Sequence, residues 1–194
     1  MNIDCQHYLD LVENEHLLAA WDTESQGFEG DYGRMYVVSV KPFGKEPITL
    51  SLSENGQDRG LVKDARDLLH EYPCWMTFYG KGHDVPLLNT RLVRWGYAPL
   101  ETRHHIDVYF LVKHRLKTGR RSQAHLLEFL GETMELLNIP RVAKMTVSPN
   151  VWSDLFTNFP KNIRLLRNRC ASDTVGLEAL YRMTRHLIRD IARG

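Results

Sequence analysis

The sequence contains little cysteine and no long apolar run. Its three cysteines form no CxxC pair, and their number is odd. This pattern argues against a disulfide framework and against a zinc knuckle. No apolar run approaches the roughly 18 residues of a membrane span, and residues 1–4 lack a signal-peptide pattern. We therefore expect a protein of the reducing cytoplasm that does not enter a membrane.

An excess of one sign of charge is also missing. The 25 Lys and Arg residues nearly balance the 24 Asp and Glu residues, which gives a formal net charge of +1. Global attraction to nucleic acid or to a membrane surface is therefore not expected, and any basic binding surface must be local. The 194 residues suffice for one well-buried core and are short for two. Because no repeat, low-complexity tract or convincing linker divides the chain, residues 1–194 are predicted to form a single domain.

The first half of the chain alternates short apolar runs with turn residues, whereas the second half is mostly helical in pattern. The ranges predicted as strands are 17–22, 35–40, 48–52, 74–79 and 105–108. The ranges predicted as helices are 1–16, 61–70, 85–95 and most of the chain from 109 onward, with interruptions near Pro140 and Pro149 and a last helix over 171–192. Strands with helices between and after them predict an α/β fold with a mixed five-stranded sheet and helices packed on its faces.

Four acidic residues occupy positions where burial is expected. A buried carboxylate is unfavourable unless it is protonated or paired with a cation. Asp22 and Glu24 close the first apolar run and, two positions apart on a strand, point to the same face. Asp84 opens one predicted amphipathic helix. Asp173 opens another, over 171–192, where it shares the core-facing stripe with leucines. A pair of divalent cations would satisfy all four, which points to metal-assisted hydrolysis of phosphodiesters.

Each of these carboxylates also has a purely structural interpretation. Asp22 and Glu24 would fit the water-facing end of a strand equally well. Asp84 would fit the N-cap of a helix with Pro86 in its first turn. Asp173 is harder to explain in this way, because an inward-facing carboxylate needs a partner and metal ligation is one of the few good ones.

Taken together, these segments resemble the DEDD-type (DnaQ-like) 3′–5′ exonucleases of the ribonuclease-H-like superfamily. Residues 22–24, Asp-Thr-Glu, match the first motif of that family. The run YGKGHDVPLLNTR at 79–91 is similar to the second motif and keeps its Gly-Lys, Asp, Pro and Leu positions. Asp173 and the helix around it resemble the third, and 105–107 resemble the segment that joins motifs two and three. The resemblance covers roughly 17–190, nearly the whole chain.

The resemblance implies a ribonuclease-H-like fold and a two-metal mechanism. Asp22, Glu24, Asp84 and Asp173 would hold two Mg²⁺ or Mn²⁺ ions and carry catalysis. The substrate would be a single-stranded 3′ end of DNA or RNA, with a polymerase or helicase partner left unspecified. Two alternatives remain on the same fold: a catalytically weak nucleic-acid-binding or scaffold module, and a structure-selective endonuclease.

The chain departs from the family pattern where relatives carry a general base. Those positions hold Asn168 and Arg169, and an arginine stays protonated at neutral pH. The Asn and Phe expected in the second motif are Tyr79 and His83. The side chains considered as substitute bases, because histidine titrates in the useful range, are His83, His104 and His105.

Substrate contacts are predicted around the same motifs. Tyr79 and His83 are placed to stack a terminal base, and a basic run interpreted as part of a helix would bind backbone phosphates unless it is simply a solvated face. The residues predicted to bind substrate are Thr23, Tyr79, His83, Arg91, Lys113, Arg120, Arg121 and Arg169.

Overall fold

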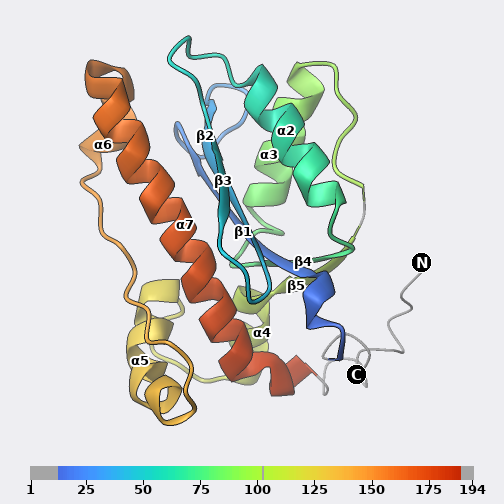
Figure 1. Cartoon of the computed structure of the whole chain (residues 1–194), viewed down its shortest axis with the longest axis vertical. Coiled ribbons are helices and arrows are strands. Elements are labelled where there is room, and N and C mark those ends of the chain that lie inside the picture. The colour runs from blue at the N-terminus through green and yellow to red at the C-terminus, as the bar shows by residue number, and fades with distance from the viewer. Residues whose placement is uncertain (1–12, 102, 189–194) are drawn as a thin grey trace.

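The structure, a computed structural model, describes residues 13–101 and 103–188. Its centre is a five-stranded sheet in the order β3-β2-β1-β4-β5 (Figure 1). The β1–β2 and β2–β3 pairs are antiparallel, whereas β1–β4 and β4–β5 are parallel. The strands are β1 (Leu18–Ser25), β2 (Met35–Pro42), β3 (Ile48–Ser51), β4 (Cys74–Thr77) and β5 (His104–Asp107). The predicted mixed α/β sheet is therefore confirmed.

The start of β1 is apolar at every position because both faces of the sheet are covered. Side chains alternate between the faces of a strand. Ala19 and Trp21 belong to one hydrophobic cluster, whereas Leu18 and Ala20 belong to another, and all four are fully buried. Asp22 therefore points to the same face of β1 as Leu18 and Ala20.

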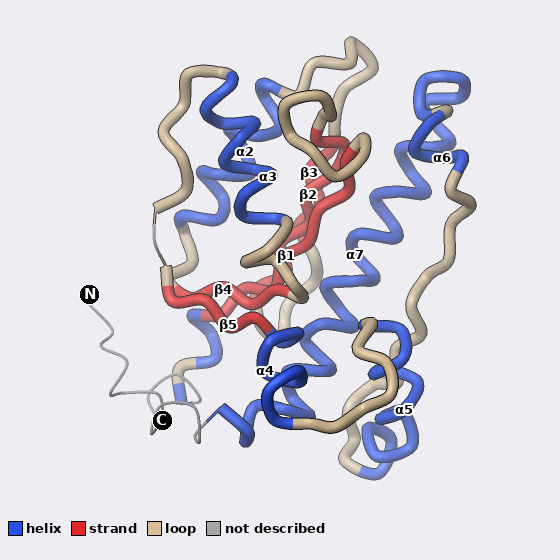
Figure 2. The backbone as a smooth tube through the Cα atoms, turned by 180° about the vertical axis from the view of Figure 1, so that it is seen from behind, coloured by secondary structure: helices blue, strands red, loops and turns tan. Residues whose placement is uncertain are grey.

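Helices cover both faces of the sheet (Figures 1 and 2). On one face lie α2 (Arg59–His70) and α3 (Asp84–Arg94), whose leucines pack with Trp21. On the other lie α4 (Val108–Arg115), α5 (Gln123–Leu136) and the second half of α7 (Phe159–Thr184). The remaining short helices are η2 (Glu15–Leu17), α6 (Asn150–Ser153) and η3 (Leu155–Asn158). Within the described ranges, no helix is both long and apolar enough to span a membrane.

The C-terminal helix begins earlier than the sequence suggested. The range 171–192 was expected to begin a helix near Asp173, but α7 begins at Phe159, with a proline in its first turn. Asp173 therefore lies within a continuous helix rather than at its start. The rest of the expected range, beyond residue 188, lies outside the described residues, as does most of the helix expected over 1–16.

The end of the fourth strand and the placement of the basic run also differ from expectation. The fourth strand ends at Thr77 rather than at residue 79, because Tyr79 adopts a positive φ of 66° that no β-strand accommodates. The basic run is not one helical face. Lys113 lies in the last turn of α4, whereas Arg120 and Arg121 lie in the loop that precedes α5.

The connection between α5 and α6 positions the site. Residues 139–148 contain no regular secondary structure, and they run alongside α7 back toward the start of that helix (Figures 1 and 2). Their path brings Lys144 and Met145 to α7, where both residues contact polar side chains of the helix.

Candidate metal centre

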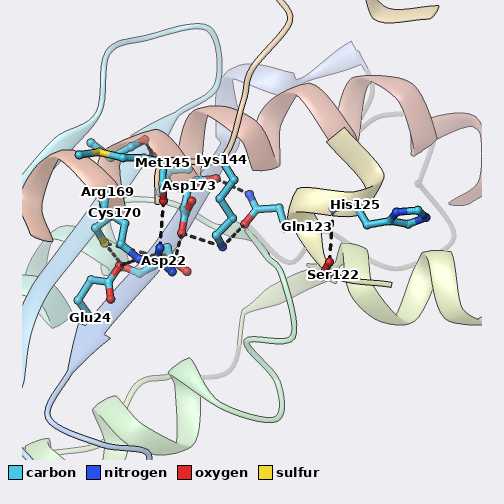
Figure 3. A network of polar contacts seen from close by, with 12 residues as sticks. Asp22, Glu24, Ser122, Gln123, His125, Lys144, Met145, Arg169, Cys170 and Asp173 are labelled. Carbon is cyan, nitrogen blue, oxygen red and sulfur yellow. Dashed lines mark hydrogen bonds and ion pairs between the residues drawn. The ribbon is translucent and has the colours of Figure 1, made fainter. Parts of the chain in front are cut away.

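Three of the predicted acidic residues meet where β1 crosses α7. One carboxylate oxygen from each of Asp22, Glu24 and Asp173 lies within 4.8 Å of the others. Figure 3 shows the three side chains converging from the strand and the helix. Glu24 and Asp173 are buried, and Asp22 is partly buried. The convergence follows from strand alternation in β1 and from the passage of α7 over the same face.

Asp84 approaches the end of β1 from the other layer of helices. It is the first residue of α3 and only 4% exposed, and its Oδ1 accepts a hydrogen bond from Thr23 Oγ1 at 2.5 Å. Its side chain does not cap the helix, because His83 occupies the cap position and makes no side-chain capping bond. Asp84 lies outside the group of three, but its charge contributes to a raised pKa of Asp22.

Burial and mutual repulsion make these carboxylates costly to ionise. Burial raises the pKa of Asp22 well above its usual range, and the charges of Asp84, Asp173 and Glu24 raise it further. Burial likewise raises the pKa of Glu24 to about 7, although the Arg169 guanidinium opposes the shift. The cluster therefore favours any cation that replaces the lost hydration.

Two basic side chains already contact the cluster. Arg169 Nε donates to Glu24 Oε1 at 2.8 Å, and its Nη2 lies 3.8 Å from Asp173 Oδ2. Lys144 Nζ lies 2.9 Å from the same Asp173 oxygen. Trp152 Nε1 donates to Glu24 Oε2 at 2.9 Å, and the Arg169 guanidinium lies 5.2 Å from the centre of the Trp152 ring. Glu24 is thus held at both of its oxygens.

The donor set fits a divalent cation. Carboxylate oxygens are the hard ligands that Mg²⁺ and Mn²⁺ prefer. Asp173 Oδ1 is buried and has no hydrogen-bond partner within the part of the chain that the structure describes. A buried carboxylate oxygen that lacks a hydrogen-bond partner and lies beside two further carboxylates is suited to binding a metal ion. The neighbouring Cys170 thiol donates to the backbone oxygen of Asp22 at 3.3 Å, and burial raises its pKa well above the usual range, so it remains a neutral thiol.

Sequence reasoning missed three residues of this site: Gln123, Lys144 and Trp152. Gln123 Nε2 donates to the backbone oxygen of Asp173 at 2.7 Å, and Gln123 Oε1 accepts from Lys144 at 3.2 Å. Lys144 lies in an irregular segment with no periodicity to mark it. Trp152 is partly buried against the core and donates its indole N–H to Glu24.

Arg91, which was expected to bind substrate, lies in a buried ion pair. Arg91 is 4% exposed and pairs with Asp58 through two hydrogen bonds of 2.8 Å. Its third contact is the backbone oxygen of Gly30 at 2.9 Å, and Asp58 also accepts from the backbone of Met35. Arg91 therefore ties α3 to the start of α2 and to the loop before β2.

Of the histidines considered as bases, His105 is held by contacts with Thr77 and Trp75. Its Nε2 lies 2.7 Å from Thr77 Oγ1, and its ring contacts Trp75, which packs with the α2 and α3 layer. Burial lowers the pKa of His105 to about 4. His83 packs its ring edge-on against Phe28, with the centroids 5.8 Å apart.

The other predicted contact residues lie in different surroundings, and two of them line an aromatic pocket at the end of β4. Tyr79 and Arg121 belong to the pocket lining, and Lys113 lies 5.7 Å from the centre of the Phe110 ring. Thr23 orients Asp84 as described above. Arg169 contacts two of the carboxylates and so lies within the site.

Solved structures share this fold at low sequence identity. The family B DNA polymerase from the archaeon Pyrobaculum calidifontis is 16% identical with a TM-score of 0.62, and the match covers 86% of this chain and 24% of the polymerase. Brucella melitensis NrnC is 17% identical with a TM-score of 0.58. The same protein with bound Mg²⁺ is 18% identical with a TM-score of 0.60. Each NrnC match covers 94% of this chain and 79% of that one.

Comparison at the sequence level gives a family but no close relative. A search of curated protein sequences found no match. Residues 20–144 match the RNase_H_2 family, which is described as part of the RNase_H superfamily. This range includes Asp22, Glu24, Asp84 and Lys144, and it ends before Arg169 and Asp173. The chain belongs to the RNase_H superfamily.

Proposed function

We propose that this chain is a metal-dependent 3′–5′ exonuclease that hydrolyses phosphodiester bonds of DNA or RNA at a single-stranded 3′ end by a two-metal mechanism. The observation that carries the proposal is the convergence of Asp22, Glu24 and Asp173 within 4.8 Å, with an unpartnered buried oxygen on Asp173. Asp84 completes the motif set from the adjoining helix. The likeness to NrnC, which has been solved with bound Mg²⁺, supports divalent metal use.

The four carboxylates have distinct tasks in this proposal. Asp22, Glu24 and Asp173 would hold one Mg²⁺ or Mn²⁺ ion, and Asp22 with Asp84 would hold a second. Bound ions of this kind supply charge neutralisation at the phosphate and activation of the attacking water. Thr23 fixes the orientation of Asp84 by donating to its Oδ1, so that the other oxygen stays available.

The basic residues bind the phosphate rather than act as bases. Arg169 contacts Glu24, and Lys144 contacts Asp173, so both basic side chains lie at the acidic cluster. If the carboxylates held metal ions, these two basic side chains would be less strongly attracted to Glu24 and Asp173. A phosphate diester then replaces that anionic partner, which places the scissile bond against the acidic cluster.

The proposal is tested with end-labelled substrates. Single- and double-stranded DNA and RNA should be incubated with Mg²⁺, Mn²⁺ or EDTA, and the products resolved by length. Stepwise shortening from the 3′ end that EDTA abolishes is the expected result. Cleavage of a circular single strand would instead indicate an endonuclease, and metal-independent cleavage would contradict the proposal.

A second candidate is a nucleic-acid-binding or scaffold module with weak turnover. It is favoured by one observation: within the acidic cluster, Arg169 pairs with Glu24 and Lys144 pairs with Asp173. This candidate predicts nucleic-acid binding that EDTA does not affect, together with product formation no faster than that of an Asp22→Asn variant.

A further inference from the structure

Strand β3 leaves one edge of the sheet open. It is the last strand in the order β3-β2-β1-β4-β5, and among the described residues it pairs with β2 alone (Figure 1). All four of its residues are exposed or partly buried. An edge strand presents unpaired backbone donors and acceptors, which makes it a template for another extended chain.

The hydrogen-bond pattern shows which backbone groups of β3 face outward. Leu52 N donates to Tyr36 O at 2.7 Å, and these two residues continue the register of β3 and β2. In an antiparallel pair, the residues that bond across to the partner strand recur at every second position. The even-numbered residues of β3 therefore bond to β2, whereas Thr49 and Ser51 direct their N–H and C=O groups away from the sheet.

On the α2 side of this edge lies a polar pocket of about 350 Å³. Leu50 of β3 lines it together with residues of the following loop and of α2. The loop contributes uncharged polar side chains, among them Asn55 and Gln57. The start of α2 contributes one cation and one anion, Arg59 and Asp64, so the pocket has no excess of charge. It suits an uncharged polar side chain.

On the α7 side of the same edge the surroundings are basic. Helix α7 packs against β2 and β3, and Arg167 Nη1 donates to Ser51 Oγ at 2.8 Å. Arg164 lies three residues earlier on α7, and both arginines are exposed. Neither forms an ion pair with any residue that the structure describes. From Phe159 to Ser172, α7 contains no acidic residue that could offset them.

The charges decide which occupant fits this edge. Two copies joined antiparallel through β3 would place Arg164 and Arg167 of both copies on the same face of a continuous sheet, where like charges repel. An extended peptide with a carboxylate at every second residue would instead direct its carboxylates toward these arginines, because alternate side chains of a strand share a face. Its remaining side chains would point to the polar pocket on the α2 side.

We propose that β3 binds an extended acidic segment of a partner protein, which adds to the sheet as a further strand. Thr49 and Ser51 supply the backbone hydrogen bonds, and Arg164 and Arg167 pair with the carboxylates of the segment. The surface goes beyond the proposed nuclease activity, because it needs neither a metal ion nor a nucleic acid. Strands β2 and β3 separate it from Glu24 in β1, so the partner would be held beside the acidic cluster rather than in it.

A labelled peptide of alternating Asp and Thr, longer than β3, tests the surface with the full chain. Fluorescence anisotropy measures its Kd. A peptide of alternating Lys and Thr reverses the charge. The Asp and Thr peptide with N-methylated backbone amides keeps the charge but donates no backbone hydrogen bond. Both control peptides should bind at least about tenfold more weakly than the parent peptide, because the surface requires both kinds of contact.

Amide hydrogen exchange, followed by NMR, locates the bound peptide. At a peptide concentration of about ten times the Kd, the amides of Thr49 and Ser51 should exchange about tenfold more slowly, because only the free protein exposes them. The amide of Leu50 already faces β2 and serves as an internal control, with a smaller change expected.

A pair of double variants separates this edge from general attraction to a basic protein. Arg164→Gln combined with Arg167→Gln should raise the Kd of the Asp and Thr peptide about fivefold. Arg94→Gln combined with Lys117→Gln removes the same charge at exposed positions of α3 and of the loop after α4. This second pair should leave the Kd unchanged, and an equal loss with both pairs would overturn the surface.

Four further results would overturn the proposal. Tight binding of the N-methylated peptide would mean that charge alone holds it, and unchanged exchange at Thr49 and Ser51 would place the peptide elsewhere. Protection of these two amides that increases with protein concentration alone would assign the edge to a second copy of the chain. Displacement of the peptide by oligothymidine, weakened by the Arg164→Gln and Arg167→Gln pair, would assign the arginines to nucleic acid.

Discussion

Arg169 and Glu24 form an ion pair inside the cluster of carboxylates that the chain would need for metal binding. The Nε–Oε1 distance is 2.8 Å, and Trp152 holds the other oxygen of the same carboxylate at 2.9 Å. A second pair, between Lys144 and Asp173, has the same character. A buried carboxylate is stabilised by a nearby cation, and two basic side chains of the chain itself supply that charge here.

Loss of a single predicted ligand should abolish turnover without unfolding the protein. We expect Asp22→Asn or Asp84→Asn to reduce phosphodiester cleavage by about 100-fold or more, because each change removes a metal ligand rather than core packing. The unfolding midpoint in EDTA should not fall, since a mutually repelling charge is removed. Asp64→Asn, on an exposed position of α2, is the matched control. Near wild-type turnover in either site variant would show that these residues are not the ligands.

The stability of the metal-free protein should depend on pH through Glu24. Its pKa is about 7 in the folded state, against about 4.3 in an unfolded chain. Between these two pKa values the folded state binds more protons than the unfolded state. The stability that protonated Glu24 contributes is therefore fully present at low pH and is lost as the pH rises toward 7. We therefore expect the wild-type unfolding midpoint in EDTA to fall across this window relative to that of Glu24→Gln. A wild-type midpoint that rises with pH relative to the variant would contradict the assignment.

Metal binding should show the complementary pH dependence. Carboxylates bind a divalent cation only after they lose their protons. The increase in unfolding midpoint caused by Mn²⁺ should therefore grow over the range in which the metal-free protein loses stability. Thermal scans with and without Mn²⁺ at each pH measure both effects in one series.

Arg91 should matter for stability and not for catalysis. Removal of its guanidinium by Arg91→Gln leaves Asp58 buried without its ionic partner, since Asp58 is only 1% exposed. We expect a loss of about 3–5 kcal/mol in the free energy of unfolding, measured by urea denaturation. Arg94→Gln, at an exposed position of the same helix, should have little effect. A KM change with full stability in Arg91→Gln would instead restore a role in substrate binding.

The sequence was sufficient for the features that depend on local pattern. Strand alternation predicted that Asp22 and Glu24 share a face, and the motif order anticipated that Asp173 returns to them. The ion pairs were not predictable, because the position of Lys144 depends on the path of an irregular ten-residue segment, 139–148, along α7. The end of β4 was also missed. Tyrosine has a high strand propensity, but a hydrogen bond from the Tyr79 backbone N–H to Asp107, 28 residues away in the sequence, helps to hold Tyr79 in a left-handed conformation.

Lys144 should compete with the metal ion for Asp173. Its ammonium lies 2.9 Å from Asp173 Oδ2, so a divalent ion that uses this oxygen must displace it or share it. Lys144→Gln removes the competing charge but keeps a side chain able to contact Gln123. We expect Mn²⁺ to bind this variant about tenfold more tightly, equivalent to about 1.4 kcal/mol, when titrated calorimetrically without substrate. Lys161→Gln, at an exposed position of α7, controls for the change in net charge.

Lys144→Gln should also bind oligonucleotides less tightly than the wild type once the metal is saturating, because in the wild type Lys144 is then available to the phosphate. An unchanged Mn²⁺ affinity would mean that Lys144 does not share the metal site, and weaker Mn²⁺ binding would mean that it holds Asp173 in place for the ion.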